Sequence, residues 1–136
     1  WVWKSFTRGL NPIFMDPYDG VVLGKPSDPQ FEPVRRSMGY ALRLAQQLDL
    51  NKCSPMNDLS TTGYCLAKPG HQYLIYQPGA KAKLDVKLTE GEYIAEWLDL
   101  SKGTTVSKQR IAAEKQPTAF SNPLDGDAVL YIYLAQ

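Results

Sequence analysis

The sequence predicts a mainly β fold, with a small antiparallel β-sandwich over residues 63–136. A strand, a loop and an amphipathic helix precede it over residues 1–62. Three observations support this division. Short apolar or alternating runs separated by turn residues fill the second part, as is typical of a sandwich. Helical spacing of apolar residues marks one segment of the first part, and a continuous apolar run typical of a buried parallel strand comes before it.

Composition and charge exclude several classes of protein. The chain has 136 residues, of which 43% are hydrophobic and 21% are charged, which suits one domain or two small elements sharing a core. Its 15 basic and 14 acidic residues are spread evenly, so the basic stripe of a nucleic-acid-binding protein is absent. No apolar run approaches the ~20 residues of a membrane span, and no signal peptide is recognisable. We therefore expect a soluble chain with neither nucleic acid nor membrane as partner.

The first predicted element is a strand at Ile13, Phe14 and Met15, followed by a loop at residues 16–20. A strand of a parallel sheet, a loop and a helix form half of a β/α unit, which cannot bury its own strand. The missing neighbours, together with a chain that starts inside the apolar stretch Trp1, Val2, Trp3, suggest a fragment or a processed product of a longer protein.

The second predicted element is an amphipathic helix over residues 33–49. Its start is marked by Asp28-Pro29 and Glu32-Pro33, because an acidic residue before a proline suits a helix N-terminus, and Asn51 is a suitable stop. The apolar residues recur mostly at spacings of three and four: Val34, Met38, Ala41, Leu42, Ala45 and Leu48.

After residue 62, every predicted element is a strand. The turn residues 68–71 join the first two strands as a hairpin, and further turns are expected at Glu90-Gly91 and Lys102-Gly103. The final run is apolar on both faces, which predicts a central strand. The expected strands cover residues 63–67, 72–77, 84–88, 93–98, 104–106, 109–112, 118–120 and 128–134.

One loop offers candidate substrate contacts. Asp16, Tyr18 and Asp19 directly follow the predicted strand, where a β/α barrel builds its active face. The alternative is that residues 16–20 form a turn selected for its backbone, and from sequence alone the turn is the favoured interpretation. Two carboxylates this close in sequence do not by themselves define an acid/base pair.

The other polar and aromatic groups have plainer interpretations. His71 and the stretch Asp125-Gly126-Asp127 are interpreted as turn residues rather than as a base or a calcium site. Cys53 and Cys65 can form at most one disulfide, and neither has an activating partner. No metal and no cofactor is predicted. Six strand aromatics are interpreted as core, although an exposed row of them would suit sugar binding: Tyr73, Tyr76, Tyr93, Trp97, Tyr131 and Tyr133.

Four stretches resemble a known family. WKSFTRGLNPIFMDPYDG (residues 3–20) and PVRRSMGYALRLAQQLDL (residues 33–50) are similar to the end of the (β/α)8 barrel of apiosidase-like, glycoside-hydrolase-like proteins. GYCLAKPGHQYLIYQPG (residues 63–79) and PLDGDAVLYIYL (residues 123–134) resemble the β-sandwich that follows that barrel, a domain type named for collagen binding. The resemblance implies that residues 13–15 and 33–49 are the last strand and helix of a barrel.

The resemblance places the catalytic carboxylates of such barrels on earlier strands, so no catalytic residue is assigned here. The first hypothesis is a C-terminal segment of a carbohydrate-active glycoside hydrolase, inactive alone, with the sandwich as an accessory domain. The carbohydrate substrate would be a partner of the longer protein, for which export is an expectation from the resemblance only. The alternative is a stand-alone module that binds polysaccharide or collagen. Truncation would also leave apolar barrel surface, which the sandwich, a second copy of the chain or exchanged segments are expected to cover.

Overall fold

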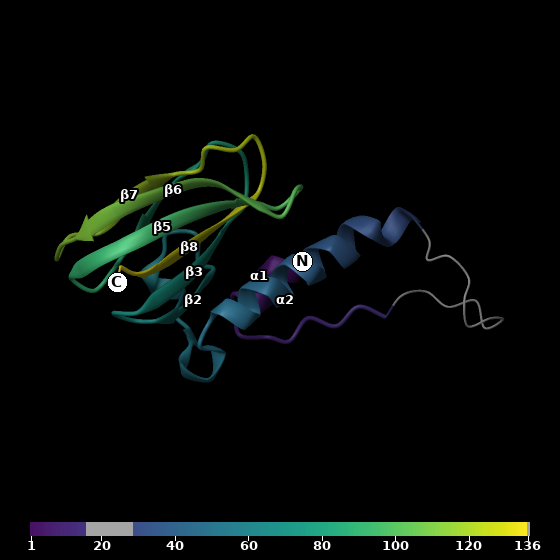
Figure 1. The fold of residues 1–136 in the computed structure, drawn as a ribbon, viewed down its shortest axis with the longest axis horizontal. Helices are drawn as coiled ribbons and strands as arrows, with labels where there is room; N and C mark the ends of the chain where they lie inside the picture. The colour runs from purple at the N-terminus through teal and green to yellow at the C-terminus, as the bar shows by residue number, and fades with distance from the viewer. Residues whose placement is uncertain (16–28, 136) are drawn as a thin grey trace.

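The computed structural model describes residues 1–15 and 29–135 and has three layers (Figure 1). A two-stranded sheet packs on one face of a six-stranded sheet, and two helices pack on the other face. Figure 1 shows that the beginning of the longer helix extends away from the strands. The predicted fold class, mainly β with a small antiparallel sandwich, is confirmed.

The strands form antiparallel ladders in both sheets. The large sheet has the order β1-β2-β3-β8-β5-β6, and β4 pairs with β7. The helices are α1 (Val2–Phe6) and α2 (Glu32–Gln47), with short 3-10 helices η1 (Pro29–Phe31), η2 (Leu50–Lys52) and η3 (Asn57–Leu59). The strands are β1 (Ser54–Pro55), β2 (Cys65–Lys68), β3 (Gln72–Gln77), β4 (Lys83–Val86), β5 (Gly91–Asp99), β6 (Thr104–Ala113), β7 (Thr118–Ser121) and β8 (Ala128–Leu134).

Most predicted elements are confirmed, with bounds that differ by a few residues, and the two predicted strands at 104–106 and 109–112 are one. The last strand, β8, is central as expected, because it lies between β3 and β5. The runs at 104–106 and 109–112 form one strand, β6, since β5 offers a partner along its whole length apart from a register shift at Trp97/Leu98. Helix α2 has Pro33 in its first turn, but it ends at Gln47, where the next residue, Leu48, is extended and buried.

The predicted strand at residues 13–15 is wrong, because these residues form neither helix nor strand. A strand needs a neighbour to accept and donate its backbone hydrogen bonds, and no strand among the described residues pairs with this segment. Phe14 instead stacks against Phe31 with ring centroids 5.6 Å apart, while Ile13 and Met15 remain 78% and 86% exposed. Helix α1, which the sequence analysis missed, packs against α2.

Two apolar cores lie on the two faces of the six-stranded sheet. The core between the sheets contains Tyr73 and Tyr93, whose rings meet edge to face at 5.9 Å. The core on the helical side contains Leu74 and Val129, both fully buried. Adjacent residues of β3 therefore belong to different cores, because side chains alternate along a strand.

The predicted boundary at residue 62 passes through connected structure. Strand β1, before that boundary, pairs with β2, after it. The core on the helical side likewise combines residues of α1 and α2 with residues of β2, β3 and β8. The division into residues 1–62 and 63–136 stays a prediction, but the two parts share a sheet and a core.

Candidate functional site

The candidate substrate contacts Asp16, Tyr18 and Asp19 lie outside the described residues, so their role stays a prediction. The described chain reaches that loop from Met15 on one side and from Pro29 on the other. These two approaches lie close together, because Phe14 contacts Phe31.

Five of the six strand aromatics are core residues, as predicted, and the sixth, Tyr133, is only partly buried. Tyr73, Tyr93 and Trp97 point between the two sheets and are at most 3% exposed. The hydroxyl groups of Tyr73 and Tyr93 both hydrogen-bond Thr89. Tyr76 and Tyr131 face the helices and are also buried. These side chains therefore form no solvent-facing row of rings on which a sugar chain could stack.

A polar pocket of about 160 Å³ lies where the end of α2 meets β5, β6 and β8. The Arg43 guanidinium stands over the Tyr40 ring at 4.7 Å and donates a hydrogen bond to the Gly103 carbonyl oxygen at 3.0 Å. Gly103 has a φ of +66°, and a Cβ there would lie 2.2 Å from the Tyr40 ring. Only glycine suits this position, so the β5–β6 turn and α2 fit closely together.

Glu96 is the one carboxylate that lines this pocket. Its Oε1 atom accepts hydrogen bonds from Lys108 Nζ at 2.8 Å and from the Tyr133 hydroxyl at 2.7 Å. Burial acts to raise the pKa of Glu96, but the hydrogen bonds from Lys108 and Tyr133 outweigh it and hold that pKa below its usual value of 4.5. The side chain is therefore ionised near neutral pH and ties β5 to β6 and β8.

Replacing this carboxylate should remove a pH-dependent part of the stability. Because the folded-state pKa of Glu96 is lowered, its contribution is present above the unfolded-state pKa and is lost as the pH falls through the folded-state value. We expect Glu96→Gln to cost about 1 kcal/mol near neutral pH, and much less near about pH 3. Urea unfolding at both pH values measures this, and a difference that stays constant with pH would contradict it.

A second polar cluster fixes the loop between β7 and β8. Asp127 accepts hydrogen bonds from the Tyr76 hydroxyl and, at 2.8 Å, from the Gly79 backbone N–H. Burial and the bond to Asp127 raise the pKa of Tyr76. Asn122 Nδ2 donates to the carbonyl oxygens of Gly79 and Gly126 at 3.0 and 2.8 Å. In this arrangement Asp127 stabilises the loop.

We expect Asp127→Ala to lower the free energy of unfolding by about 1–3 kcal/mol, because it leaves the buried Tyr76 hydroxyl without its acceptor. Asp125→Ala is the matched control, since the ion pair of Asp125 with Lys81 is exposed on both sides and should contribute less than about 1 kcal/mol. Chemical denaturation of the two variants measures the difference. Equal losses of unfolding free energy in the two variants would show that the hydrogen bonds of Asp127 do not stabilise the loop.

Both cysteines are free thiols. Cys65 is fully buried, and burial raises the pKa of its thiol to about 12. Burial also raises the pKa of Cys53, whose Sγ accepts a hydrogen bond from Gln72 Nε2 at 3.2 Å. A protonated thiol is a poor nucleophile, so the interpretation of both residues as structural agrees with their surroundings.

An apolar groove of about 370 Å³ runs between α2 and the chain that follows α1. Leu42 on α2 is 60% exposed beside it, and Leu50 is 39% exposed. The residues that line the groove are Phe6, Asn11, Pro12, Met38, Gly39, Ala41, Leu42, Ala45 and Leu50.

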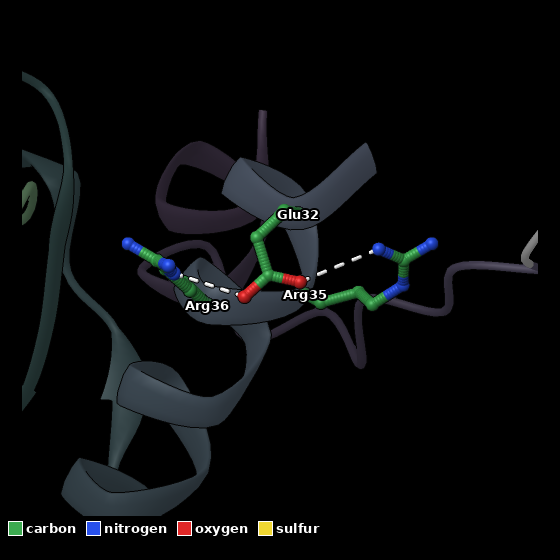
Figure 2. Close-up of polar contacts among 3 residues, drawn as sticks. All are labelled: Glu32, Arg35 and Arg36. Atoms are coloured by element: carbon green, nitrogen blue, oxygen red, sulfur yellow. Dashed lines mark hydrogen bonds and ion pairs between the residues drawn. The ribbon is translucent and has the colours of Figure 1, made fainter. Parts of the chain in front are cut away.

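Charged residues lie near the groove, at the beginning of α2. Figure 2 shows Glu32 between Arg35 and Arg36, with N to O distances of 3.4 and 2.9 Å. The hydrogen bond from Arg36, followed by that from Arg35, lowers the pKa of Glu32 against the opposing effect of desolvation. Glu32 thus forms ion pairs with both arginines in the first turns of α2.

Within the described ranges, no group of three metal-ligating side chains gathers. Over the same residues, no helix has both the length and the apolar character needed to span a membrane. Residues of α2 line both the polar pocket and the apolar groove.

No model of a known protein family matches the sequence. No curated protein matches it either. Two solved structures are similar in fold. One, a glycoside hydrolase family 5 protein from Bacteroides vulgatus ATCC 8482, is 15% identical with a TM-score of 0.57, and the match covers 75% of this chain and 24% of that one. The other, described as a glycoside hydrolase, is 14% identical with a TM-score of 0.61, and the match covers 88% of this chain and 31% of that one.

These likenesses show a fold shared with parts of glycoside hydrolase structures. The chain spans only about a quarter to a third of the length of the two matched chains. The residues after α2 make up about 65% of the present chain. Both matches cover more than that share, so each includes residues that precede the end of α2, and the match over 88% of the chain includes part of the helices as well as the sandwich.

Proposed function

We propose that this chain is the non-catalytic C-terminal segment of a glycoside-hydrolase-like protein, in which the sandwich is an accessory domain. One observation carries the proposal: the helical layer and the sandwich share a core, and the fold match to one glycoside hydrolase covers part of both. The role of the sandwich in this proposal is to stabilise the protein to which its helices belong.

The chemistry of the polar pocket supports a non-catalytic role. Most glycoside hydrolases use two carboxyl groups that flank the scissile bond, one as acid and one as base or nucleophile. Among the described residues that line the pocket beside α2, Glu96 is the one carboxylate, and it already accepts hydrogen bonds from Lys108 and Tyr133. In the proposed protein, the catalytic pair and the carbohydrate substrate belong to the part that precedes this segment.

The finer version of the proposal follows from the sequence resemblance. In this finer version, the longer protein is apiosidase-like and exported, and its sandwich is of the type named for collagen binding. The stand-alone binding module has weaker support, because Trp97 and all but one of the strand tyrosines are buried. Collagen binding would therefore have to use a surface other than these rings.

Hydrolysis assays test the proposal directly. The purified chain should release no product from a panel of aryl glycosides and plant oligosaccharides above the rate without protein. The longer natural gene product, assayed in parallel, should hydrolyse at least one of them. Turnover by the 136-residue chain alone would contradict the proposed role.

A further inference from the structure

The polar pocket between α2 and the sheet contains a buried hydroxyl group that the protein leaves unused. Tyr131 lines this pocket and is only 9% exposed, yet its hydroxyl forms no hydrogen bond within residues 1–15 and 29–135. A buried polar group normally has a hydrogen-bond partner, and a group without one in the protein needs water or a ligand. Because Tyr131 lines the pocket, a molecule bound there can supply that partner.

Helix α2 adds two polar side chains to the same pocket, Arg43 and Gln47, which lie one turn apart. The Arg43 guanidinium donates to the Gly103 carbonyl oxygen, and its other N–H groups have no hydrogen-bond partner among the described residues. The Gln47 side-chain amide likewise forms no hydrogen bond with those residues. Both side chains are therefore available to a molecule in the pocket.

The sheet contributes a hydrogen-bond acceptor, the Glu96 carboxylate. Lys108 and Tyr133 both contact its Oε1 atom. Among the described residues, its Oε2 atom accepts only a hydrogen bond from the Thr105 hydroxyl, and at 3.3 Å this bond is longer than is usual between two oxygen atoms. The Oε2 atom can therefore accept a shorter hydrogen bond from a hydroxyl group of a ligand.

These groups together fit a neutral ligand with several hydroxyl groups. The Arg43 guanidinium can only donate hydrogen bonds and the ionised Glu96 carboxylate can only accept them, whereas a hydroxyl does both. An anionic ligand would be repelled by Glu96 and a cationic one by Arg43. The volume of about 160 Å³ equals the share of about five water molecules in the liquid, at roughly 30 Å³ each, which limits the ligand to about one ring.

We propose that this pocket binds a single neutral sugar residue. The apolar side chains of Leu44 and Leu98 also line the pocket and provide contacts for the carbon atoms of the sugar ring. Such a site needs no exposed row of aromatic rings, because hydrogen bonds orient the ligand. The inference goes beyond the proposed function and does not rest on it, since it uses only the side chains that line the pocket and needs no catalytic pair of carboxyl groups.

An NMR titration of the 136-residue chain with neutral monosaccharides tests the proposal. D-glucose, D-galactose, D-xylose and L-arabinose are added separately to about 100 mM, because a ligand of this size is expected to bind in the millimolar range. At least one sugar should cause saturable shifts at the backbone amides of Gly103 and Thr105 and at the side-chain amide of Gln47. The amide of Thr118, on β7 in the other sheet, should not shift.

Three substitutions assign the binding to the pocket. Tyr131→Phe removes only the unused hydroxyl, so it should weaken binding by roughly two- to tenfold and leave the urea midpoint unchanged. Gln47→Ala, at an exposed position on a different element, should weaken binding by a similar factor. Tyr64→Phe is the matched control and should leave binding unchanged, because Tyr64 packs against Tyr76 and does not line the pocket.

The outcomes separate this inference from the proposed function. The absence of saturable shifts with all four sugars would overturn the inference, as would binding that Tyr131→Phe and Gln47→Ala leave unchanged. Shifts caused by acetate or glucuronate but by no neutral sugar would identify an anion site at Arg43 and would also overturn it. The proposed function would stand in each case, because the hydrolysis assays test it separately.

Discussion

Removal of residues 1–53 is expected to leave residues 54–136 aggregated or loosely packed, although every strand of both sheets is retained. The deletion uncovers the helix-facing side of the large sheet, including Leu66, Leu74 and Val129, which are at most 3% exposed in the intact chain. Burying each such side chain stabilises the fold by about 1.5–3 kcal/mol, and a typical domain has only about 5–15 kcal/mol in total. Size-exclusion chromatography and binding of an apolar dye measure the effect.

A control variant identifies the cause of this loss. The truncated chain with Leu74→Thr and Val129→Thr has a more polar exposed face and an intact core between the sheets. It should regain solubility if the uncovered apolar face is responsible. A soluble, monomeric truncated chain as stable as the intact one would contradict the shared core, and it would favour a stand-alone binding module.

Leu74→Ala should have the largest effect of the single substitutions considered, with a loss of about 2–5 kcal/mol in the free energy of unfolding. Leu74 is fully buried on the side of β3 that faces the helices. Shortening its side chain to that of alanine therefore leaves a cavity between the sheet and the helices. Leu42→Ala is the matched control, because Leu42 is 60% exposed and its loss should change stability by no more than about 0.5 kcal/mol.

Urea unfolding of both variants, with the slope against denaturant checked for constancy, gives the two free energies. A cost for Leu42→Ala as large as that for Leu74→Ala would show that the groove is already occupied in the isolated chain.

The sandwich could be predicted from the sequence because each of its strands and turns has a local sequence pattern. Alternation along β4 and β5 marks one dry face, and the fully apolar run of β8 marks a central strand. The turn at Lys102-Gly103 is also local, since Gly103 adopts a positive φ that favours glycine. The prediction of α2 succeeded for the same reason, through its spacing and Pro33.

The failures concern features that depend on distant partners. Residues 13–15 have the composition of a buried strand, but composition cannot supply the neighbour that such a strand requires. Helix α1 was missed because five residues are too few for a clear helical period, and its stability comes from packing Val2, Trp3 and Phe6 against the rest of the helical layer. The candidate contacts Asp16, Tyr18 and Asp19 remain predictions. The polar pocket could not be predicted, because it combines residues far apart in sequence.

The position of β3 connects the two cores energetically. Every residue of β3 is buried, and neighbouring side chains face opposite layers. Disturbing the helical layer therefore disturbs the strand that also supports the sandwich, and the chain should unfold in a single cooperative transition. By the same linkage, a partner that binds only the folded form of α2 raises the unfolding temperature of the sandwich, even though it touches no residue between the two sheets.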